Sequence, residues 1–149
     1  MELIQVLAGV ALCGGLNPSQ LASLAAISHR EVFNTDAVIF KQNDPGSKMY
    51  LITHGQVEIR LNDEGGGNHA TIYLGQGQIF GEMALLDQGS RSASVVAIEE
   101  QTELYVITAD AFVNLCQQDT AIGYIIMRNM ALDLSFKLRH KNLDPSASL

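Results

Sequence analysis

Glu82 and Arg91 are two charged side chains whose setting in the sequence points to chemistry. They lie in residues 80–95, a segment that interrupts a long run of strand-like sequence. Residues 82–86 are good helix formers, and Gly81 before them lets the backbone turn sharply, so we expect a single helical turn between two strands. The start of such a turn presents backbone N–H groups that suit an anion.

The pair Glu82 and Arg91 allows two interpretations. A carboxylate and a guanidinium on either side of a tight turn can form a surface salt bridge, which contributes about 0–1 kcal/mol. Alternatively, the two groups bind one ligand. A carboxylate accepts a hydrogen bond from a ribose 2′-hydroxyl, and a guanidinium and backbone amides donate to a cyclic phosphodiester. Ser92 adds a hydroxyl next to Arg91, and the residue types by themselves leave both interpretations open.

The same segment resembles the phosphate-binding cassette of the cyclic-nucleotide-binding domains. This family includes the bacterial catabolite activator, the regulatory subunits of protein kinase A and cyclic-nucleotide-gated channels. Its cassette reads approximately F-G-E-x-A-L, then a short variable turn, then R-[STA]-A-x-V. Residues 80–85 and 91–95 match this pattern without a gap or a substitution. Residues 10–16 and 38–55 resemble two further stretches of the family, with Asn43 at a usual glycine and Cys13 at a usual aromatic residue.

The resemblance implies a role for each cassette position. Glu82 is expected to bind the ribose 2′-hydroxyl and Arg91 the phosphate, while the backbone at Gly81 approaches the ligand closely. Backbone amides near Met83 and Ala84, together with Ser92, are expected to complete the phosphate contacts. The ligand-binding residues that it implies are Phe80, Gly81, Glu82, Met83, Ala84, Arg91, Ser92 and Ala93. Members of the family bind the nucleotide without hydrolysing it, so we expect no catalytic residue, no enzyme activity and no cofactor.

The resemblance defines the base of the ligand less sharply. In the family, alanine after the arginine favours cAMP and threonine favours cGMP, so Ser92 is compatible with both. The chain shows no other guanine-reading feature, which favours cAMP over cGMP. The last helix usually covers the base. Phe136, Lys137 and Arg139 fall in that region, although Phe136 is equally suited to the core.

The elements that position the cassette form three zones of one domain, residues 1–149. Residues 1–30 are predicted to be helical, with Asn17 as N-cap, Pro18 at the first helical position and Gln20 completing a capping box. Residues 31–107 contain short β-branched and aromatic runs separated by turn residues. This texture predicts a mainly β domain with flanking helices, built as an antiparallel β-roll or jelly-roll-like barrel. The strands expected are 38–40, 49–53, 57–61, 71–74, 92–97 and 102–107, with residues 62–68 as an exposed hairpin loop.

Residues 108–140 are predicted to form two C-terminal helices, followed by a tail at 141–149. Thr108 caps the first, which ends near residue 118, and the second runs from about 121 to 140. The second helix has an apolar stripe of Ile122, Ile126, Met130, Leu134 and Leu138. Such a stripe either packs on the β-roll or pairs with a second copy as a homodimer.

Composition excludes several classes. A chain of 149 residues has room for one domain, and a net charge of −7 makes it a poor general nucleic-acid binder. Cys13 and Cys116 lack CxxC spacing and are expected to be free thiols in a reducing cytoplasm. The histidines lack metal-ligand spacing. The apolar run at residues 3–16, predicted to be a core helix and a loop, is too short to span a membrane.

In the family, nucleotide binding moves the C-terminal helices. The residues after His140 are too few for a helix-turn-helix, so we expect no DNA-binding domain in this chain. The switch therefore acts on a partner protein or on a fused output domain. The alternative is a protein-interaction module that keeps the fold without binding nucleotide. The presence of both Glu82 and Arg91 favours the sensor.

Overall fold

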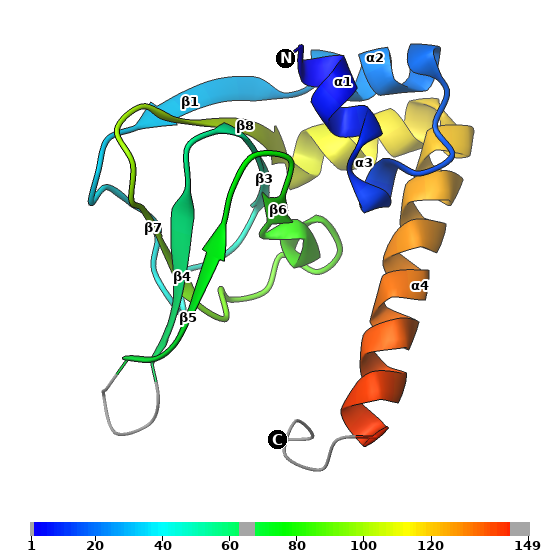
Figure 1. Ribbon diagram of the computed structural model, residues 1–149. Coiled ribbons are helices and arrows are strands. Elements are labelled where there is room, and N and C mark those ends of the chain that lie inside the picture. The colour runs from blue at the N-terminus through cyan, green and yellow to red at the C-terminus, as the bar shows by residue number, and fades with distance from the viewer. Residues whose placement is uncertain (1, 63–67, 144–149) are drawn as a thin grey trace.

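The computed structural model describes residues 2–62 and 68–143, in which helices from both ends of the chain gather at one side of a body of strands (Figure 1). The strands are β1 (His29–Phe33), β2 (Val38–Phe40), β3 (Lys48–His54), β4 (Val57–Asn62), β5 (Asn68–Leu74), β6 (Ile79–Phe80), β7 (Ser94–Ala97) and β8 (Thr102–Thr108). The helices are α1 (Leu3–Ala8), α2 (Pro18–Ala26), α3 (Ala109–Gln118) and α4 (Thr120–Leu143), with 3-10 turns η1 (Ala11–Cys13) and η2 (Glu82–Leu85).

Two antiparallel sheets of four strands each make up the roll, with strand orders β1-β8-β3-β6 and β2-β7-β4-β5. An apolar cluster lies between them, to which β3 contributes Tyr50 and Ile52 and β8 contributes Leu104 and Val106. These residues alternate along each strand, as the two-residue period of a strand requires. The predicted class, mainly β with flanking helices, is confirmed. The described strands form two sheets and not one closed barrel.

Strand β3 is buried on both faces, and this attaches the helices to the roll. Met49 and Leu51 point away from the inner cluster and pack with Ile107 against side chains of the helices. A strand that is covered on both sides needs a nearly continuous apolar sequence, which β3 has. The helices therefore rest on the outer face of the first sheet.

Local sequence determines where two of the helices begin. The Asn17 side chain accepts a hydrogen bond from the Gln20 amide at 2.8 Å, and the Gln20 side chain accepts one from the Asn17 amide at 2.9 Å. Pro18 occupies the first helical position of α2. At the start of α3, the Thr108 hydroxyl accepts from the Ala111 amide at 3.2 Å. Both predicted starts are confirmed.

Helix α4 differs from the prediction in length and in its apolar stripe. It begins at Thr120 and ends at Leu143, so the first three residues of the predicted tail are helical, and residues 144–149 lie outside the described residues. The stripe changes from buried to exposed along the helix, in the order Ile122, Ile126, Met130, Leu134 and Leu138. Residues four apart are displaced by about 40° around a helix, so such a row turns away from the core. The far half of α4 also extends away from the other helices (Figure 1).

Tertiary pairing adds strands that the sequence did not indicate. Residues 1–30 were predicted to be helical, but β1 begins at His29 because it pairs with Val106 of β8. The two-residue strand β6 exists because it pairs with β3. The predicted strand at 92–97 begins later, at Ser94. In the predicted loop at 62–68, Asn62 and Asn68 belong to paired strands, and residues 63–67 lie outside the described residues.

Candidate functional site

The backbone of residues 80–95 turns sharply at Gly81, between β6 and η2. Gly81 has a φ of 77°, in the left-handed region that favours glycine. The Ala84 amide donates to the Gly81 carbonyl at 3.2 Å, and the Leu86 amide donates to the Met83 carbonyl at 3.0 Å. The predicted single turn between strands is therefore present as a 3-10 turn. The Ala84 amide, which was expected to face a phosphate, already donates within that turn.

A pocket of about 480 Å³ lies beside η2. All eight residues expected to bind a ligand line it: Phe80, Gly81, Glu82, Met83, Ala84, Arg91, Ser92 and Ala93. Apolar side chains complete much of the wall, namely Phe40, Ile59, Leu74, Ile79 and Val95. Of the polar members, Arg91 is buried, Glu82 is half-buried and Ser92 is exposed. The structure therefore brings the cassette residues together around one cavity.

Arg91 is a buried cation in this pocket, with only 8% of its surface exposed. Its Nη2 donates to the Lys48 carbonyl at 2.8 Å, and its Nη1 donates to the Gly81 carbonyl at 3.4 Å. Its Nε is buried and has no hydrogen-bond partner among the residues that the structure describes. Burial lowers the pKa of this guanidinium from its usual value, and Tyr50 and Asp44 act against that shift.

Glu82 and Arg91, both in the described part of the chain, do not form an ion pair. Because Arg91 is buried and separate from Glu82, the surface salt-bridge interpretation is wrong. A buried charge without a counter-ion is unfavourable, since it has lost its hydration and gained no partner. An anion in the pocket would supply that partner to Arg91.

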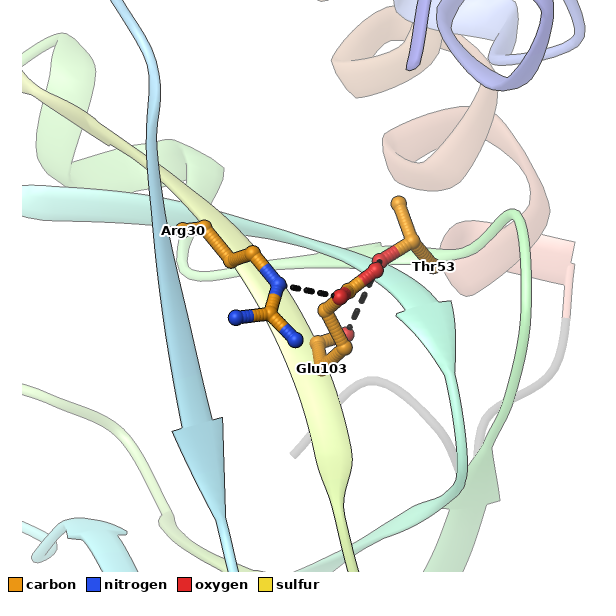
Figure 2. Close-up of polar contacts among 3 residues, drawn as sticks. All are labelled: Arg30, Thr53 and Glu103. Atoms are coloured by element: carbon orange, nitrogen blue, oxygen red, sulfur yellow. Dashed lines mark hydrogen bonds and ion pairs between the residues drawn. The ribbon is translucent and has the colours of Figure 1, made fainter. Parts of the chain in front are cut away.

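Arg30 shows how this chain compensates a guanidinium elsewhere (Figure 2). Its Nε pairs with the carboxylate of Glu103, which also accepts a hydrogen bond from the Thr53 hydroxyl at 2.6 Å. The Thr53 hydroxyl and Arg30 hold the pKa of Glu103 below its usual range. The Arg30 side chain is 57% exposed and still has a counter-ion. Arg91 is far more buried and has none among the described residues.

Phe40 and Tyr50 lie close to Arg91 and belong to the site, although the sequence did not indicate them. The Arg91 Cζ lies 4.1 Å from the ring centroid of Phe40 and 5.9 Å from that of Tyr50. The ring of Phe80, which the cassette motif did indicate, stacks on Tyr50 with a centroid distance of 4.9 Å. In the sequence, Phe40 and Tyr50 look like ordinary strand core. No local pattern shows that β2 and residue 91 meet, so the signal was absent.

The residues considered for covering a base lie away from this pocket. Phe136 is 60% exposed, and neither it nor Lys137 nor Arg139 lines the pocket. A second cleft of about 350 Å³ lies between this part of α4 and the residues Glu82 and Met83, and Lys137 lines that cleft. In this structure α4 therefore stands away from η2.

Other site types have less support. Within residues 2–62 and 68–143, no three His, Cys, Asp or Glu side chains are grouped so that they could hold a metal ion. Within the same ranges, no helix is long and apolar enough to cross a membrane. Cys13 and Cys116 are free thiols, and burial raises the pKa of Cys13 to about 11.

Comparison with known proteins agrees with this geometry. The model of the cyclic nucleotide-binding domain family matches residues 30–119. The cyclic AMP receptor protein of Thermus thermophilus is 33% identical over 136 residues, which cover 91% of this chain and 61% of that protein. A cGMP-dependent protein kinase of Toxoplasma gondii is 26% identical over 125 residues, which cover 84% of this chain and 12% of the kinase.

Solved structures show the same relationship. The crystal structure of the catabolite activator protein of Thermus thermophilus aligns with a TM-score of 0.79 at 33% identity, covering 89% of this chain and 60% of that one. This chain therefore belongs to the cyclic nucleotide-binding domain family. It spans about three fifths of the length of the Thermus relative.

Proposed function

We propose that this chain is a sensor domain, not an enzyme, and that it binds cAMP in the pocket beside η2. Arg91 donates to the cyclic phosphate and Glu82 accepts from the ribose 2′-hydroxyl, while the Ser92 hydroxyl contacts the phosphate. The backbone from Gly81 to Ala84 lies against the sugar and phosphate. The free thiols Cys13 and Cys116 support a location in the reducing cytoplasm.

The observation that carries this proposal is the buried guanidinium of Arg91, whose Nε has no hydrogen-bond partner in the described part of the chain. A phosphodiester would accept a hydrogen bond from that Nε and would neutralise the buried charge. The volume of about 480 Å³ is in the range of small-molecule sites, about 300–1,000 Å³. Membership of the family supports the ligand class.

We favour cAMP as the ligand and keep cGMP as the alternative. A relative named a cyclic AMP receptor protein shares 33% identity with most of this chain, which supports cAMP. A relative named a cGMP-dependent protein kinase keeps cGMP open. Ser92 is exposed beside the pocket and suits either base.

Thermal unfolding of the purified protein, freed of bound ligand, tests this function with cAMP, cGMP and linear 5′-AMP. A ligand at 100 times its Kd adds about 2.7 kcal/mol to the free energy of unfolding if it binds only the folded state. This corresponds to a rise in Tm of roughly 5–10 °C. We expect that rise with cAMP, a smaller one with cGMP and none with 5′-AMP.

Two arginine variants locate the site. Arg91→Gln should abolish the rise in Tm, whereas Arg30→Gln, which breaks an ion pair outside the pocket, should keep it. If neither cyclic nucleotide shifts the Tm of the native protein, the protein-interaction module becomes the better description. If Arg91→Gln responds like the native protein, the function stands and the site is wrong.

We further propose that the nucleotide draws α4 toward η2 and closes the cleft of about 350 Å³ between them. The pKa of Lys137 is raised by Asp133 and, more weakly, by Glu82 on the other side of that cleft, so closure brings opposite charges together. The nucleotide shifts this equilibrium only by binding the closed state more tightly. Spin labels at the exposed positions of Leu86 and Arg139 should approach one another when cAMP is added. An unchanged distance would contradict the switch.

The exposed side of α4 also supports a homodimer. Tyr124, Met127, Ala131, Leu134 and Leu138 follow one another at spacings of three and four residues, the seam pattern of a coiled coil. Tyr124 is 68% exposed and Leu138 is 61% exposed, so the row leaves apolar surface in contact with water. A second copy of α4 would cover them. The switch would then act through that dimer on a partner or on an output domain outside this chain.

A matched pair of variants tests the dimer. Leu138 lies on the seam and is 61% exposed, whereas Phe136 lies off the seam and is 60% exposed. In sedimentation experiments, Leu138→Lys should shift the equilibrium toward the monomer, and Phe136→Lys should not. A native protein that stays monomeric at high concentration, or an equal effect of both variants, would reject the seam.

A further inference from the structure

The face of the Phe40 ring lies against the guanidinium of Arg91, with its centroid 4.1 Å from Cζ. Phe40 belongs to β2 in the second sheet, whereas Tyr50 and Phe80 belong to the first. The Phe40 ring lies 5.8 Å from the Tyr50 ring and 5.9 Å from the Phe80 ring, centroid to centroid. The three rings therefore form one aromatic cluster that joins the two sheets, and the Arg91 guanidinium lies over its Phe40 and Tyr50 rings.

Backbone without a side chain also lies close to Arg91. A Cβ at Gly46 would lie 3.0 Å from Nε and 3.1 Å from Cζ of Arg91. The loop around Gly46 is held there, because the Gly46 amide donates to the Gly89 carbonyl at 3.0 Å and the Arg91 amide donates to the Asp44 carbonyl at 2.7 Å. The guanidinium therefore lies close to both the Phe40 ring and the backbone of Gly46.

Among residues 2–62 and 68–143, no carboxylate forms an ion pair with Arg91. The nearby Asp44 side chain accepts from the Lys41 amide at 3.0 Å and forms no ion pair with Arg91. A counter-ion would have to be displaced, or would repel the anion, when a phosphate bound. An aromatic face attracts a cation without competing for its N–H donors. The ring therefore stabilises the charge without occupying the Nε–H donor.

We propose that Phe40 is a positioning residue, whose ring replaces a counter-ion and keeps the Arg91 guanidinium aimed into the pocket. The proposal rests on the proposed function for its effect on nucleotide affinity. The contact between ring and cation exists without the nucleotide and is tested separately below.

The test replaces Phe40 with mono-, di- and trifluorophenylalanine. Fluorine weakens the negative face of the ring and changes its shape little, so it separates attraction for the cation from packing. The matched control is the same series at Phe33, which is half-buried in the same cluster and has no cation over its ring among the described residues. For each protein we would measure unliganded Tm and the Kd for cAMP by calorimetry.

The unliganded Tm and the Kd for cAMP should both change with the number of fluorines at Phe40. We expect Tm to fall stepwise and the Kd for cAMP to rise about tenfold across the series, because the guanidinium is less often aimed at the ligand. In the Phe33 series, neither the Tm nor the Kd should change stepwise with the number of fluorines. A Kd that is independent of fluorine at Phe40 would overturn the positioning role, even if the native protein binds cAMP well.

A second background tests the contact without any nucleotide. Arg91→Met removes the cation, so the stepwise loss of Tm at Phe40 should disappear in that background. If the loss persists unchanged, Phe40 only packs and the inference is wrong. If Arg91→Met does not fold, the contact is tested instead by hydrogen exchange at the Arg91 Nε in the fluorinated Phe40 proteins. The exchange rate should increase with each fluorine, and a constant rate would overturn the contact. If the native protein binds no cyclic nucleotide, the function fails while this stability comparison still decides the role of the ring.

Discussion

Replacing Gly81 by alanine would test how closely the backbone and the guanidinium fit. Gly81 has a φ of 77°, and a Cβ there would lie 2.8 Å from Nη1 of Arg91 and 3.0 Å from the Lys48 carbonyl. Gly77 provides a matched control, because its φ is 86° and its Cβ would meet nothing within 4 Å. Gly77→Ala therefore introduces backbone strain alone, whereas Gly81→Ala also displaces Arg91.

The two effects have different sizes and different readouts. A left-handed backbone costs a non-glycine residue about 1–2 kcal/mol, so each variant should lose roughly 2–8 °C of unliganded Tm. In Gly81→Ala the added Cβ needs space beside both the guanidinium and the Lys48 carbonyl. The carbonyl is part of the backbone and is less free to move, so the Arg91 guanidinium must shift. Losing a hydrogen bond between a charged group and the ligand costs about 1.5–3 kcal/mol. This predicts an increase in Kd for cAMP of about 10- to 150-fold.

Calorimetric titration with cAMP and thermal unfolding without ligand would be run on the native protein and both variants. Gly77→Ala should melt at a temperature no lower than Gly81→Ala, which also displaces Arg91, and should bind cAMP like the native protein. If the two variants bind cAMP equally tightly, Arg91 either tolerates the added Cβ or does not contact the ligand. Either result would refute the reasoning.

Three further predictions concern the rest of the fold. The folded state holds the pKa of Glu103 low, so the free energy of unfolding should fall as the pH drops from about 7 to 3. Chemical denaturation at a series of pH values should show a smaller fall in this free energy for Glu103→Gln. Equal slopes would contradict this. The pKa of Cys13 is about 11 in the folded state, so stability should fall as the pH rises above about 9, where the unfolded thiol ionises; the same denaturation assay should show this slope reduced in Cys13→Ala. Asn17→Ala removes the N-cap of α2 and should cost about 1 kcal/mol in thermal unfolding without changing the Kd for cAMP, whereas a changed Kd would mean that α2 is coupled to the pocket.

Features that depend on neighbours in the chain could be predicted. The capping box at Asn17 and Gln20 and the cap at Thr108 were visible, because each hydrogen bond joins residues three apart. The turn at Gly81 was visible for the same reason. The cassette motif also placed its residues correctly in one pocket, since they are close in sequence. The ligand contacts of these residues remain a prediction.

Features that depend on distant pairing could not be predicted. Strand β1 crosses the predicted boundary between the helical and the β zone and was not among the expected strands, because its hydrogen-bonding partner β8 begins some 70 residues later, and a short segment pairs only where the sheet has room for it. The apolar stripe of α4 was predicted as one surface. Where it is buried and where it is exposed depends on how far the β-roll and the other helices reach along α4, which no local period encodes.

The sequence by itself determined the family pattern of residues 80–95, the turn at Gly81 and the presence of Glu82 and Arg91 in one short segment. It left the relation between these two charges undecided. The tertiary structure decided that relation, because it buries Arg91 close to the Phe40 ring and the backbone of Gly46 and forms no ion pair between Arg91 and Glu82. Strand β2 comes from about 50 residues earlier in the chain, and only sheet packing brings it beneath Arg91. The physical reason is that solvation and charge compensation depend on what surrounds a group in space.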